Sequence, residues 1–358
     1  MRILFAMPSA EYSVLDSGTG HAAALRQIPG VQLEEWLLYN RLKIMYRALD
    51  LDQTRENLAI VSYQACKMIV GDALETDAEW VVISSAMAFH PNALLLLRKI
   101  NVKIAVIFTE CPYDDGDLAY FAQLCDVVCA NDKYSSEKYG WHYLGSAYNP
   151  VVHCPGPSDA PNHDVVIVGT GWDERVRLFD AVDWTGVNLG MYGFWPQLAL
   201  DQESVNMREA VGMTPNDAAR EHLGQYVDEP TSNQEAVELY RNANICINDH
   251  RKHPDAYSAN PRVYEVLAVG GGLLLTDWRD ELVDILGKRA REFCFDGPQE
   301  LEERIRYFLT HEEERQELVR YGQECVIPHT FQERAKTLFS LMEAHQGVNG
   351  RAELTLMK

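Results

Sequence analysis

A chain of 358 residues is longer than one compact core normally needs, so two domains of similar size are expected. Apolar residues make up 47% of the chain and aromatic residues 10%, which is ample for packed cores and excludes a largely disordered protein. The formal net charge of −21 disfavours a protein whose main task is to grip a nucleic-acid backbone, because that affinity comes from clustered Lys and Arg.

The eight cysteines are scattered, and the absence of any Cys-x-x-Cys pair disfavours a zinc ribbon or a dithiol redox centre. The apolar N-terminal segment is interrupted by Pro8 and is too short for a signal peptide. No apolar run approaches the roughly 18 residues of a membrane-spanning helix. We therefore expect a soluble, cytoplasmic protein with buried thiols.

The first half of the chain alternates predicted strands with predicted helices. Strands are expected at 2–7, 31–36, 80–84, 103–109 and 127–130. The segment 40–74 should be mainly helical, and a polar loop with Gly18 and Gly20 should connect the first strand to an Ala-rich helix. This alternation predicts a doubly wound parallel sheet.

A stretch containing Pro, Gly and Asp at 149–162 predicts an interdomain linker. The alternation then restarts. Strands are expected at 164–169, 187–192 and 245–248, and helices from Arg175, at 233–241, at 298–309 and at 312–326. The predicted fold class is therefore α/β, with two Rossmann-like domains that face a cleft.

The segment 260–277 is the most informative part of the sequence. It begins as a helix, is stopped by three glycines, and continues as an apolar strand that ends in Thr-Asp. Arg262 and the helix dipole suit a phosphate, whereas Glu265 suits ribose hydroxyls. This combination indicates a nucleotide-sugar site.

Several further segments carry a family resemblance together with Asn260–Glu265. In the second half they are Val168–Val176, Ala181–Val187 and Ile247–Arg251. In the first half they are Met7–Ser9, Tyr12–Asp16, Thr109–Asp115 and Ala147–Pro150. In this order they resemble the CgeB-like glycosyltransferases of the GT-B superfamily, including forms common in bacteriophage genomes.

The resemblance implies how the two domains divide the work. Residues 1–152 would form the Rossmann-like acceptor domain, and residues 160–330 would form the nucleotide-sugar donor domain. The last helix, which begins near Phe331 within a C-terminal segment of about 331–358, would cross back to the N-terminal domain.

The predicted donor site combines residues read from the sequence with positions implied by the resemblance. Its members are Gly18, Gly20, Gly169, Thr170, Gly171, Arg175, Tyr192, Arg262, Tyr264 and Glu265. Gly169-Thr170-Gly171 at a strand end would offer backbone N–H groups to an anion, and Arg175 would add charge. The Gly18–Gly20 segment matches neither a Walker loop nor a dinucleotide fingerprint, which disfavours a nicotinamide dehydrogenase.

Four residues are predicted to act near the reacting atoms: His90, Glu110, His250 and Arg251. His90 and Glu110 each follow a predicted strand of a parallel sheet, where polar side chains often serve function. For His90, a loop histidine bonded to backbone is an equal alternative. The second acidic residue found upstream of Glu265 in related enzymes is displaced here, so no sugar-contacting residue is assigned.

The run Tyr113-Asp114-Asp115-Gly116-Asp117 resembles a cation site, but in a GT-B context we expect Asp114 or Asp115 to cap the next helix. No metal is predicted. No cofactor is predicted either, because the nucleotide-diphospho-sugar, expected to be UDP-linked, is a co-substrate.

The predicted reaction is sugar transfer to an acceptor hydroxyl, with retention of configuration and without a metal. The acceptor would be a phage virion protein or another glycan. One alternative is transfer to a hydroxymethylated DNA base, which the acidic charge disfavours although a small basic groove would suffice. Others are a nucleotide-sugar epimerase and a non-catalytic nucleotide-sugar-binding protein. No membrane partner is expected, and a phage-encoded enzyme would act in the host cytoplasm.

Overall fold

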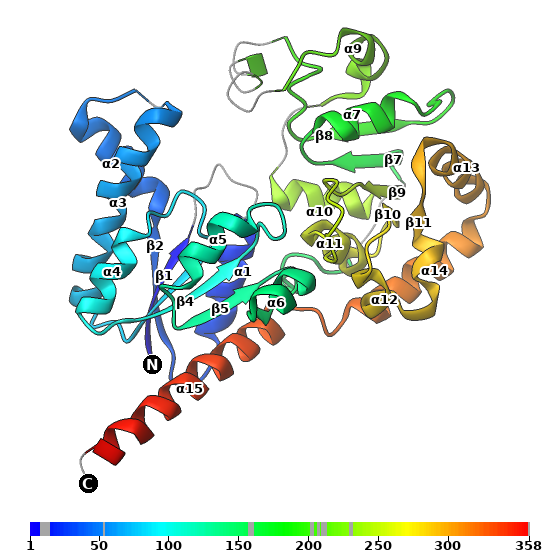
Figure 1. The fold of residues 1–358 in the computed structure, drawn as a ribbon. Coiled ribbons are helices and arrows are strands. Elements are labelled where there is room, and N and C mark those ends of the chain that lie inside the picture. The colour runs from blue at the N-terminus through cyan, green and yellow to red at the C-terminus, as the bar shows by residue number, and fades with distance from the viewer. Residues whose placement is uncertain are drawn as a thin grey trace. The chain divides into compact units, whose positions relative to one another are not determined.

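The computed structural model describes residues 1–7, 15–52, 54–156, 161–200, 204–205, 208, 213–228 and 232–356. These divide into two compact units (Figure 1). Unit 1 contains Met1–Ala147, Asp255–Ser258 and Thr330–Lys358, and unit 2 contains Tyr148–Pro254 and Ala259–His329. Of the segments that carried the resemblance, Pro8, Ser9 and positions 12–14 lie outside the described residues.

Unit 1 is built on a six-stranded parallel sheet in the order β2-β1-β3-β4-β5-β6. Its strands are β1 (Arg2–Met7), β2 (Gln32–Leu37), β3 (Trp80–Ser84), β4 (Lys103–Phe108), β5 (Val127–Ala130) and β6 (His142–Tyr143). Its helices are α1 (Leu15–Arg26), α2 (Leu38–Leu49), α3 (Arg55–Glu75), α4 (Asn92–Lys99), α5 (Asp115–Ala122), α6 (Lys133–Tyr139) and α15 (Phe331–Leu356). The sequence predicted every strand of this sheet except the two-residue β6.

Successive residues of β1 point to opposite faces of the sheet, so each face has its own core. Leu4 and Ala6 belong to the core that includes α3 and α4 residues. Ile3 and Phe5 belong to the core that includes α1 and α15 residues. The C-terminal helix therefore packs within the N-terminal unit, as the family resemblance implied.

Helix α1 contains both glycines that were expected to form a loop. Gly18 and Gly20 lie inside the helix, so the loop prediction is wrong. A Cβ at Gly20 would overlap the ring of Phe331 on α15, and α1 packs against α15. The ring of His21 also packs edge-on against Phe331, with 4.9 Å between centroids. Gly20 thus allows two helices to approach closely, and no turn requires it.

Unit 2 is built on a five-stranded parallel sheet in the order β11-β10-β9-β7-β8. Its strands are β7 (His163–Val168), β8 (Leu189–Tyr192), β9 (Ala243–Asn248), β10 (Leu273–Asp277) and β11 (Cys294–Phe295). Its helices are α7 (Asp173–Asp180), α9 (Asp217–Leu223), α10 (Asn233–Arg241), α11 (Pro261–Val269), α12 (Glu281–Leu286), α13 (Gly297–Thr310) and α14 (Glu312–Val326), with short 3-10 turns η1 (Gly224–Tyr226) and η2 (Gly287–Phe293).

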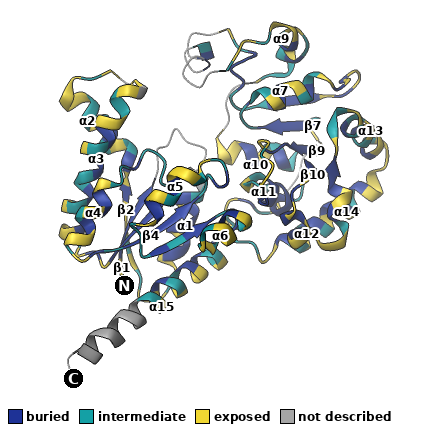
Figure 2. Cartoon of the chain, in the orientation of Figure 1, coloured by how far each residue is buried: buried dark blue, intermediate teal, exposed yellow. Residues whose placement is uncertain are grey.

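The strands of unit 2 are buried, whereas its helices have one buried and one exposed side (Figure 2). A parallel sheet covered on both faces needs nearly continuous apolar strands, and Leu273–Asp277 is buried at all its positions. In the register of the central pair, Ile167 lies beside Ile247. The same pairing brings the carboxyl ends of β7 and β9 together.

The chain reverses its direction of strand addition once in each sheet. In unit 2 this switch point lies between β7 and β9, and in unit 1 between β1 and β3. Ligands of open parallel sheets bind at the carboxyl ends of strands beside such a point. The loop that follows Val168 and the loop that follows Asn248 are therefore the places to examine for a site in unit 2.

Candidate functional site

Two arginines from different helices converge on one glycine at the switch point of unit 2. Gly169 follows β7 directly and has φ +150°, a conformation that side chains other than glycine rarely adopt. A Cβ at this position would lie 2.9 Å from Nη1 of Arg175 and 3.2 Å from Nη1 and Nη2 of Arg262. The missing side chain leaves room for both guanidinium groups, which bring two positive charges to the same strand end.

The backbone N–H groups of Gly169 and Gly171, which the sequence suggested for anion binding, already have partners within the protein. The N–H of Gly169 donates to the carbonyl of Tyr192 at 2.9 Å, and that of Gly171 donates to the carbonyl of Phe194 at 2.8 Å. The prediction that these two amides cradle a phosphate is therefore wrong. The two amides of the strand-end loop instead hold the adjoining chain.

Arg175 is almost completely buried and is held by backbone carbonyls. Its Nη1 donates to the carbonyl of Thr170 at 2.6 Å, and its Nη2 donates to the carbonyl of Asp249. Burial, followed by the charge of Arg262, lowers the pKa of Arg175 to about 10. The side chain remains cationic at neutral pH, and its position is defined before any ligand binds.

A chain of hydrogen bonds leads from Arg262 to a buried carboxylate. Oδ1 of Asn248 accepts from Nδ2 of Asn260 at 2.9 Å and from Nη1 of Arg262 at 3.4 Å. Nδ2 of Asn248 lies 3.4 Å from Nε2 of His250, whose Nδ1 lies 2.5 Å from Oδ1 of Asp277. A neutral imidazole that donates to Asp277 and accepts from Asn248 satisfies both ring nitrogens of His250.

This arrangement corrects the role expected for His250. Its side chain is only 3% exposed, and its two ring nitrogens face Asp277 and Asn248. Burial lowers the pKa of His250 despite the opposing charge of Asp277. The ring is thus positioned to orient Asn248, which accepts from Arg262, and both of its nitrogens are occupied within the protein.

The sequence interpretation missed Asp277, which ends this chain, and three charged residues around it: Asp249, Lys252 and Arg279. Nζ of Lys252 lies 3.0 Å from Oδ1 of Asp249 and 2.9 Å from Oδ2 of Asp277. Arg279 Nη1 lies 3.5 Å from the same Asp277 oxygen. A carboxylate at the end of a strand next to β9 was the signal that could have identified Asp277.

The two carboxylates differ in acidity because their partners differ. Burial alone would raise the pKa of Asp277, but His250, Lys252 and Arg279 lower it well below its usual range. Burial and the neighbouring charge of Asp277 raise the pKa of Asp249. Asp277 is thus the fixed negative charge around which the cations of this edge are arranged.

Helix α11 presents the polar side chains expected from the sequence, with one exception. Arg262 and Glu265 are half-buried, and Nε of Arg262 donates to Oη of Tyr240 at 3.2 Å. Tyr264 is fully buried in the core of unit 2, and its ring lies 5.6 Å from that of His329. Tyr264 therefore cannot reach a ligand, and its predicted binding role is wrong.

Tyr192 also differs from its prediction. Its ring lies over Gly190, where a Cβ would be 2.7 Å from Cε2 of the ring. Its hydroxyl lies 2.9 Å from Nε2 of His163, the first residue of β7. The side chain thus runs back toward the amino end of the sheet and away from the edge that carries Arg262.

Arg251 extends this edge on its exposed side. Its guanidinium carbon lies 5.7 Å from the ring centroid of Trp172, within the range of a cation–π contact. Trp172 immediately follows Gly171. Arg251 is thus placed beside the same loop as Arg175, and its role near the donor stays a prediction.

The two site residues predicted in the first half follow neighbouring strands of unit 1. His90 lies in the loop between β3 and α4, with its ring 5.0 Å from that of Tyr63. Partial burial and the charge of Lys67 lower its pKa. Glu110 follows β4 and is half-buried, with Oε1 3.4 Å from Oγ1 of Thr109. Both therefore lie at the carboxyl edge of the first sheet.

The acidic run near α5 has no cation-binding geometry. Asp114 occupies the N-cap position of α5, but its side chain makes no capping hydrogen bond, so that detail of the prediction is wrong. Oδ2 of Asp115 accepts from Oγ of Ser135 at 2.8 Å. Within the described residues, no group of three or more His, Cys, Asp or Glu side chains is arranged to hold a metal ion.

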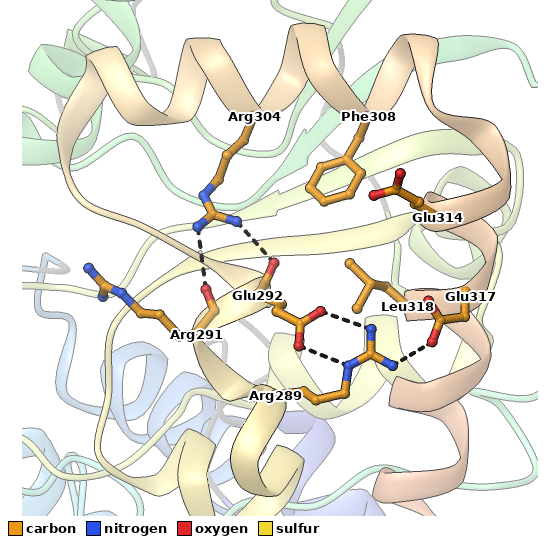
Figure 3. Close-up of a pocket in the computed structure, with 8 residues that line it drawn as sticks. All are labelled: Arg289, Arg291, Glu292, Arg304, Phe308, Glu314, Glu317 and Leu318. Carbon is orange, nitrogen blue, oxygen red and sulfur yellow. Dashed lines mark hydrogen bonds and ion pairs between the residues drawn. The ribbon is translucent and has the colours of Figure 1, made fainter.

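A pocket of about 290 Å³ in unit 2 is lined by residues of η2, α13 and α14 (Figure 3). Its lining residues are Arg289, Arg291, Glu292, Arg304, Phe308, Glu314, Glu317 and Leu318. Arg289 is bound on one side by both oxygens of Glu292 and on the other by Glu317 at 2.6 Å. Its charge is therefore neutralised within the protein, and these elements supply no residue to the cluster around Gly169.

No described helix is long and apolar enough to cross a membrane. All eight cysteines are free thiols.

Known structures share this architecture over nearly the whole chain. Sucrose-phosphate synthase from Thermosynechococcus elongatus matches with a TM-score of 0.67 at 11% identity, covering 97% of this chain and 100% of its own. A trehalose-6-phosphate synthase from E. coli bound with UDP-2-fluoro glucose matches with a TM-score of 0.63 at 11% identity. The match covers 95% of this chain and 98% of the E. coli chain. A protein from Listeria monocytogenes that is described by similarity as a UDP-N-acetylglucosamine 2-epimerase matches with a TM-score of 0.60 at 10% identity, covering 96% of each chain.

These similarities establish the GT-B fold that the sequence predicted. No curated protein matches the sequence. The sequence model of the family described as glycosyl transferase-like matches residues 156–340, which include all of the cluster around Gly169. This match spans more than half of the 358 residues of the chain, and the fold is GT-B. The chain is therefore a GT-B enzyme that belongs to the glycosyl transferase-like family.

Proposed function

We propose that unit 2 binds a nucleotide-diphospho-sugar and that the enzyme transfers its sugar to an acceptor hydroxyl bound by unit 1. The observation that carries this proposal is the pair of guanidinium groups, Arg175 and Arg262, held within 3.2 Å of the vacant Cβ position of Gly169. Two cations at a strand switch point suit a diphosphate, which carries charge on both of its phosphoryl groups.

In this proposal the remaining polar groups of α11 bind the nucleoside. Glu265 is half-buried one helical turn after Arg262, where its carboxylate would accept from ribose hydroxyls. Thr170 and Arg251 lie at the same edge and would contact the phosphates. His250 and Asp277 act indirectly, because they orient Asn248 and thereby hold Arg262 in place.

We propose that transfer retains the configuration of the sugar and requires no metal. A trehalose-6-phosphate synthase of the same fold is described as acting with retention. In a front-face reaction the bond from the anomeric carbon to the phosphate oxygen breaks, the acceptor oxygen bonds to the same face, and the leaving phosphate takes the acceptor's proton. The enzyme's task is then to stabilise the charge that develops on the diphosphate, which Arg175 and Arg262 would do.

The finer assignment follows the family resemblance. We propose a CgeB-like, phage-type enzyme with a UDP-linked donor, acting in the cytoplasm on a virion protein or a glycan. The use of UDP is supported by the E. coli structure of the same fold bound with UDP-2-fluoro glucose. Transfer to a hydroxymethylated DNA base is the alternative acceptor, and the net charge of −21 disfavours it.

The experiment that tests the donor site is calorimetric titration of the wild type and Arg262→Ala with nucleoside diphosphates, after a thermal-shift screen over the common bases. A ligand at a hundred times its dissociation constant adds about 2.7 kcal/mol to stability, so binding should be visible in the screen. Loss of one charge-assisted contact should weaken binding about tenfold to a hundredfold. Arg306→Ala, an exposed arginine of α13 in surface ion pairs, is the control and should bind normally.

Two rivals predict different results in the same preparation. An epimerase is favoured by the Listeria neighbour of the same fold, and it would convert its nucleotide-sugar without any acceptor. A non-catalytic binding protein would bind the nucleotide-sugar but turn over none of the acceptors tested. Absence of thermal shift with every nucleotide would contradict the proposal itself.

A further inference from the structure

The cluster at Gly169 in unit 2 brings together two like charges, which repel each other. Guanidinium nitrogens of Arg175 and Arg262 lie within 3.2 Å of the vacant Cβ position of Gly169. Burial first, and the charge of Arg262 second, lower the pKa of Arg175. Because like charges at this separation are unfavourable, contacts within the protein must hold both side chains in place before any anion binds.

The two arginines differ in how firmly they are held. Arg175 is only 6% exposed, and its Nη1 and Nη2 donate to the backbone carbonyls of Thr170 and Asp249. Arg262 is half-buried in the first turn of α11, and its contacts are with side chains. Arg262 is therefore the member of the pair whose position depends on neighbouring side chains.

Two side chains of unit 2 hold the guanidinium of Arg262. Its Nε donates to Oη of Tyr240 at 3.2 Å, and its Nη1 donates to Oδ1 of Asn248 at 3.4 Å. Within the described part of the chain, its Nη2 has no hydrogen-bond partner. A planar guanidinium that is held at two nitrogens has a defined orientation, so the third nitrogen is left for a ligand beside Gly169.

Tyr240 is itself fixed by the sheet of unit 2. It lies near the end of α10, is 2% exposed and belongs to the core of the unit. Its carbonyl accepts from the N–H of Gly272 at 2.9 Å and from Sγ of Cys246 at 3.7 Å. Cys246 is part of β9, and Gly272 immediately precedes β10. The two strands that end in Asn248 and Asp277 therefore also determine where Tyr240 lies.

The hydroxyl of Tyr240 orients a cation without neutralising it. Burial raises the pKa of Tyr240 well above its usual range, despite the opposing charge of Arg262, so the hydroxyl is neutral at physiological pH. A carboxylate in the same place would cancel the positive charge. Arg289 in the same unit shows that case, because it is bound by the carboxylates of Glu292 and Glu317. Arg262 keeps a charge that a diphosphate can use.

We propose that Tyr240 is a positioning residue for the donor site: its neutral hydroxyl holds Arg262 beside Gly169 against the repulsion of Arg175. This inference rests on the proposed function, because it assigns the contact to diphosphate binding. It adds a second support for Arg262, independent of the one that His250 and Asn248 provide at Nη1.

The test removes one oxygen atom, by Tyr240→Phe, and leaves the buried ring in place. Tyr321→Phe is the matched control, because Oη of Tyr321 donates to the carbonyl of Leu286 at 2.7 Å in the same unit and contacts no residue of the cluster at Gly169. Arg262→Lys completes the set. Lysine keeps the charge but has no Nε–H at this position, so Tyr240→Phe should have no further effect in an Arg262→Lys background.

Two measurements are made on each full-length variant. Inorganic pyrophosphate, which carries the diphosphate without base or sugar, should bind about fivefold or more weakly to Tyr240→Phe and normally to Tyr321→Phe. Nitrogen-15 NMR of the arginine side chains should show an Nε–H signal that is absent from Arg262→Lys. The exchange of this hydrogen with solvent should be about tenfold faster in Tyr240→Phe and unchanged in Tyr321→Phe.

The outcomes separate the positioning role from the donor site itself. If the wild type and Tyr240→Phe bind pyrophosphate equally well, the positioning role is wrong while the donor site stands. Equal weakening in Tyr321→Phe would also overturn the role, as would a full effect of Tyr240→Phe in the Arg262→Lys background, because Tyr240 would then not act through Arg262. If the wild type does not bind pyrophosphate, the proposed donor site fails, and the positioning role fails with it.

Discussion

The two units contain the same short pattern, Gly-x-Gly after their first strand, and use it for different purposes. Gly18 and Gly20 of unit 1 lie within α1, where Gly20 lets the helix pack against Phe331. Gly169 and Gly171 of unit 2 lie in a loop before α7, where Gly169 makes room for two arginines. Glycine provides space in both places. An aromatic ring fills it at Gly20, where the result is helix packing, and two guanidinium groups fill it at Gly169, where we expect binding.

The surroundings explain the difference. At the edge of unit 2, the neighbouring strands β9 and β10 end in Asn248, which accepts from Arg262, and Asp277, which pairs with Lys252 and Arg279. In unit 1, Gly20 faces the apolar ring of Phe331 instead. We therefore expect substitutions around Gly169 to alter donor binding, and substitutions around Gly20 to alter stability alone.

The largest effect is expected from Asp277→Ala. Removing this carboxylate leaves Lys252 and Arg279 without their shared partner, which should cost about 3–5 kcal/mol of the free energy of unfolding at pH 7. Because the pKa of Asp277 is lowered in the folded state, its contribution is present above the unfolded pKa near 3.8 and is lost as the pH falls through the folded value. Urea unfolding of the wild type and Asp277→Ala at pH 7 measures the loss of free energy, and the same measurement at lower pH measures its pH dependence.

Asp183→Ala is the control for this substitution. Asp183 is an exposed aspartate that pairs with Arg306 on the surface of the same unit, so its loss should change stability by less than about 0.5 kcal/mol. Equal losses in the two variants would mean that the network around Gly169 has no special stabilising role.

In unit 1 the corresponding test is the pH dependence of the free energy of unfolding, which buried His21 should affect. Burial lowers the pKa of His21 to about 4 from its usual 6.5, so the unfolded chain takes up the proton first. Stability is therefore fully present above pH 6.5 and falls as the pH drops toward 4, by about 3 kcal/mol from this residue. Unfolding at several pH values should show a smaller decline in His21→Gln. An unchanged decline would contradict a buried, neutral His21.

Gly169→Ala and Gly20→Ala test the comparison most directly. At Gly169 the new Cβ requires a strained φ and displaces both guanidinium groups, so nucleotide affinity should fall by about tenfold or more. At Gly20 it overlaps Phe331, so stability should fall by about 1–3 kcal/mol while nucleotide affinity is retained. Weakened nucleotide binding in Gly20→Ala would show that the two segments act alike.

The smallest effect is expected from His90→Gln. In a front-face reaction the leaving phosphate takes the acceptor's proton, so kcat should fall less than about tenfold and donor affinity should not change. A loss of about a hundredfold or more, with a pH profile that loses its acidic limb, would identify His90 as a general base. The product would then have inverted configuration, which NMR can determine.

Much of the fold was predictable because it depends on local patterns. Apolar runs such as Trp80–Ser84 have the length of buried strands, and the segment from Asn260 combines a helix start, a glycine stop and a strand. The predictions that failed concern directions and neighbours. Tyr192 turns back over Gly190, Tyr264 points into the core, and Gly20 meets a helix more than three hundred residues away in the sequence.

The sequence by itself determined the order of strands and helices, the position of Arg262 and Glu265 on one helix face, and the apolar strands of two parallel sheets. Hydrophobic periodicity and glycine stops act over a few residues, so these features can be read locally. Only the tertiary structure decided that Arg175 and Arg262 meet at Gly169, and that the buried ring of His250 lies between Asn248 and Asp277. Those outcomes depend on which strand ends lie side by side, and parallel strands become neighbours only when distant segments of the chain pack together.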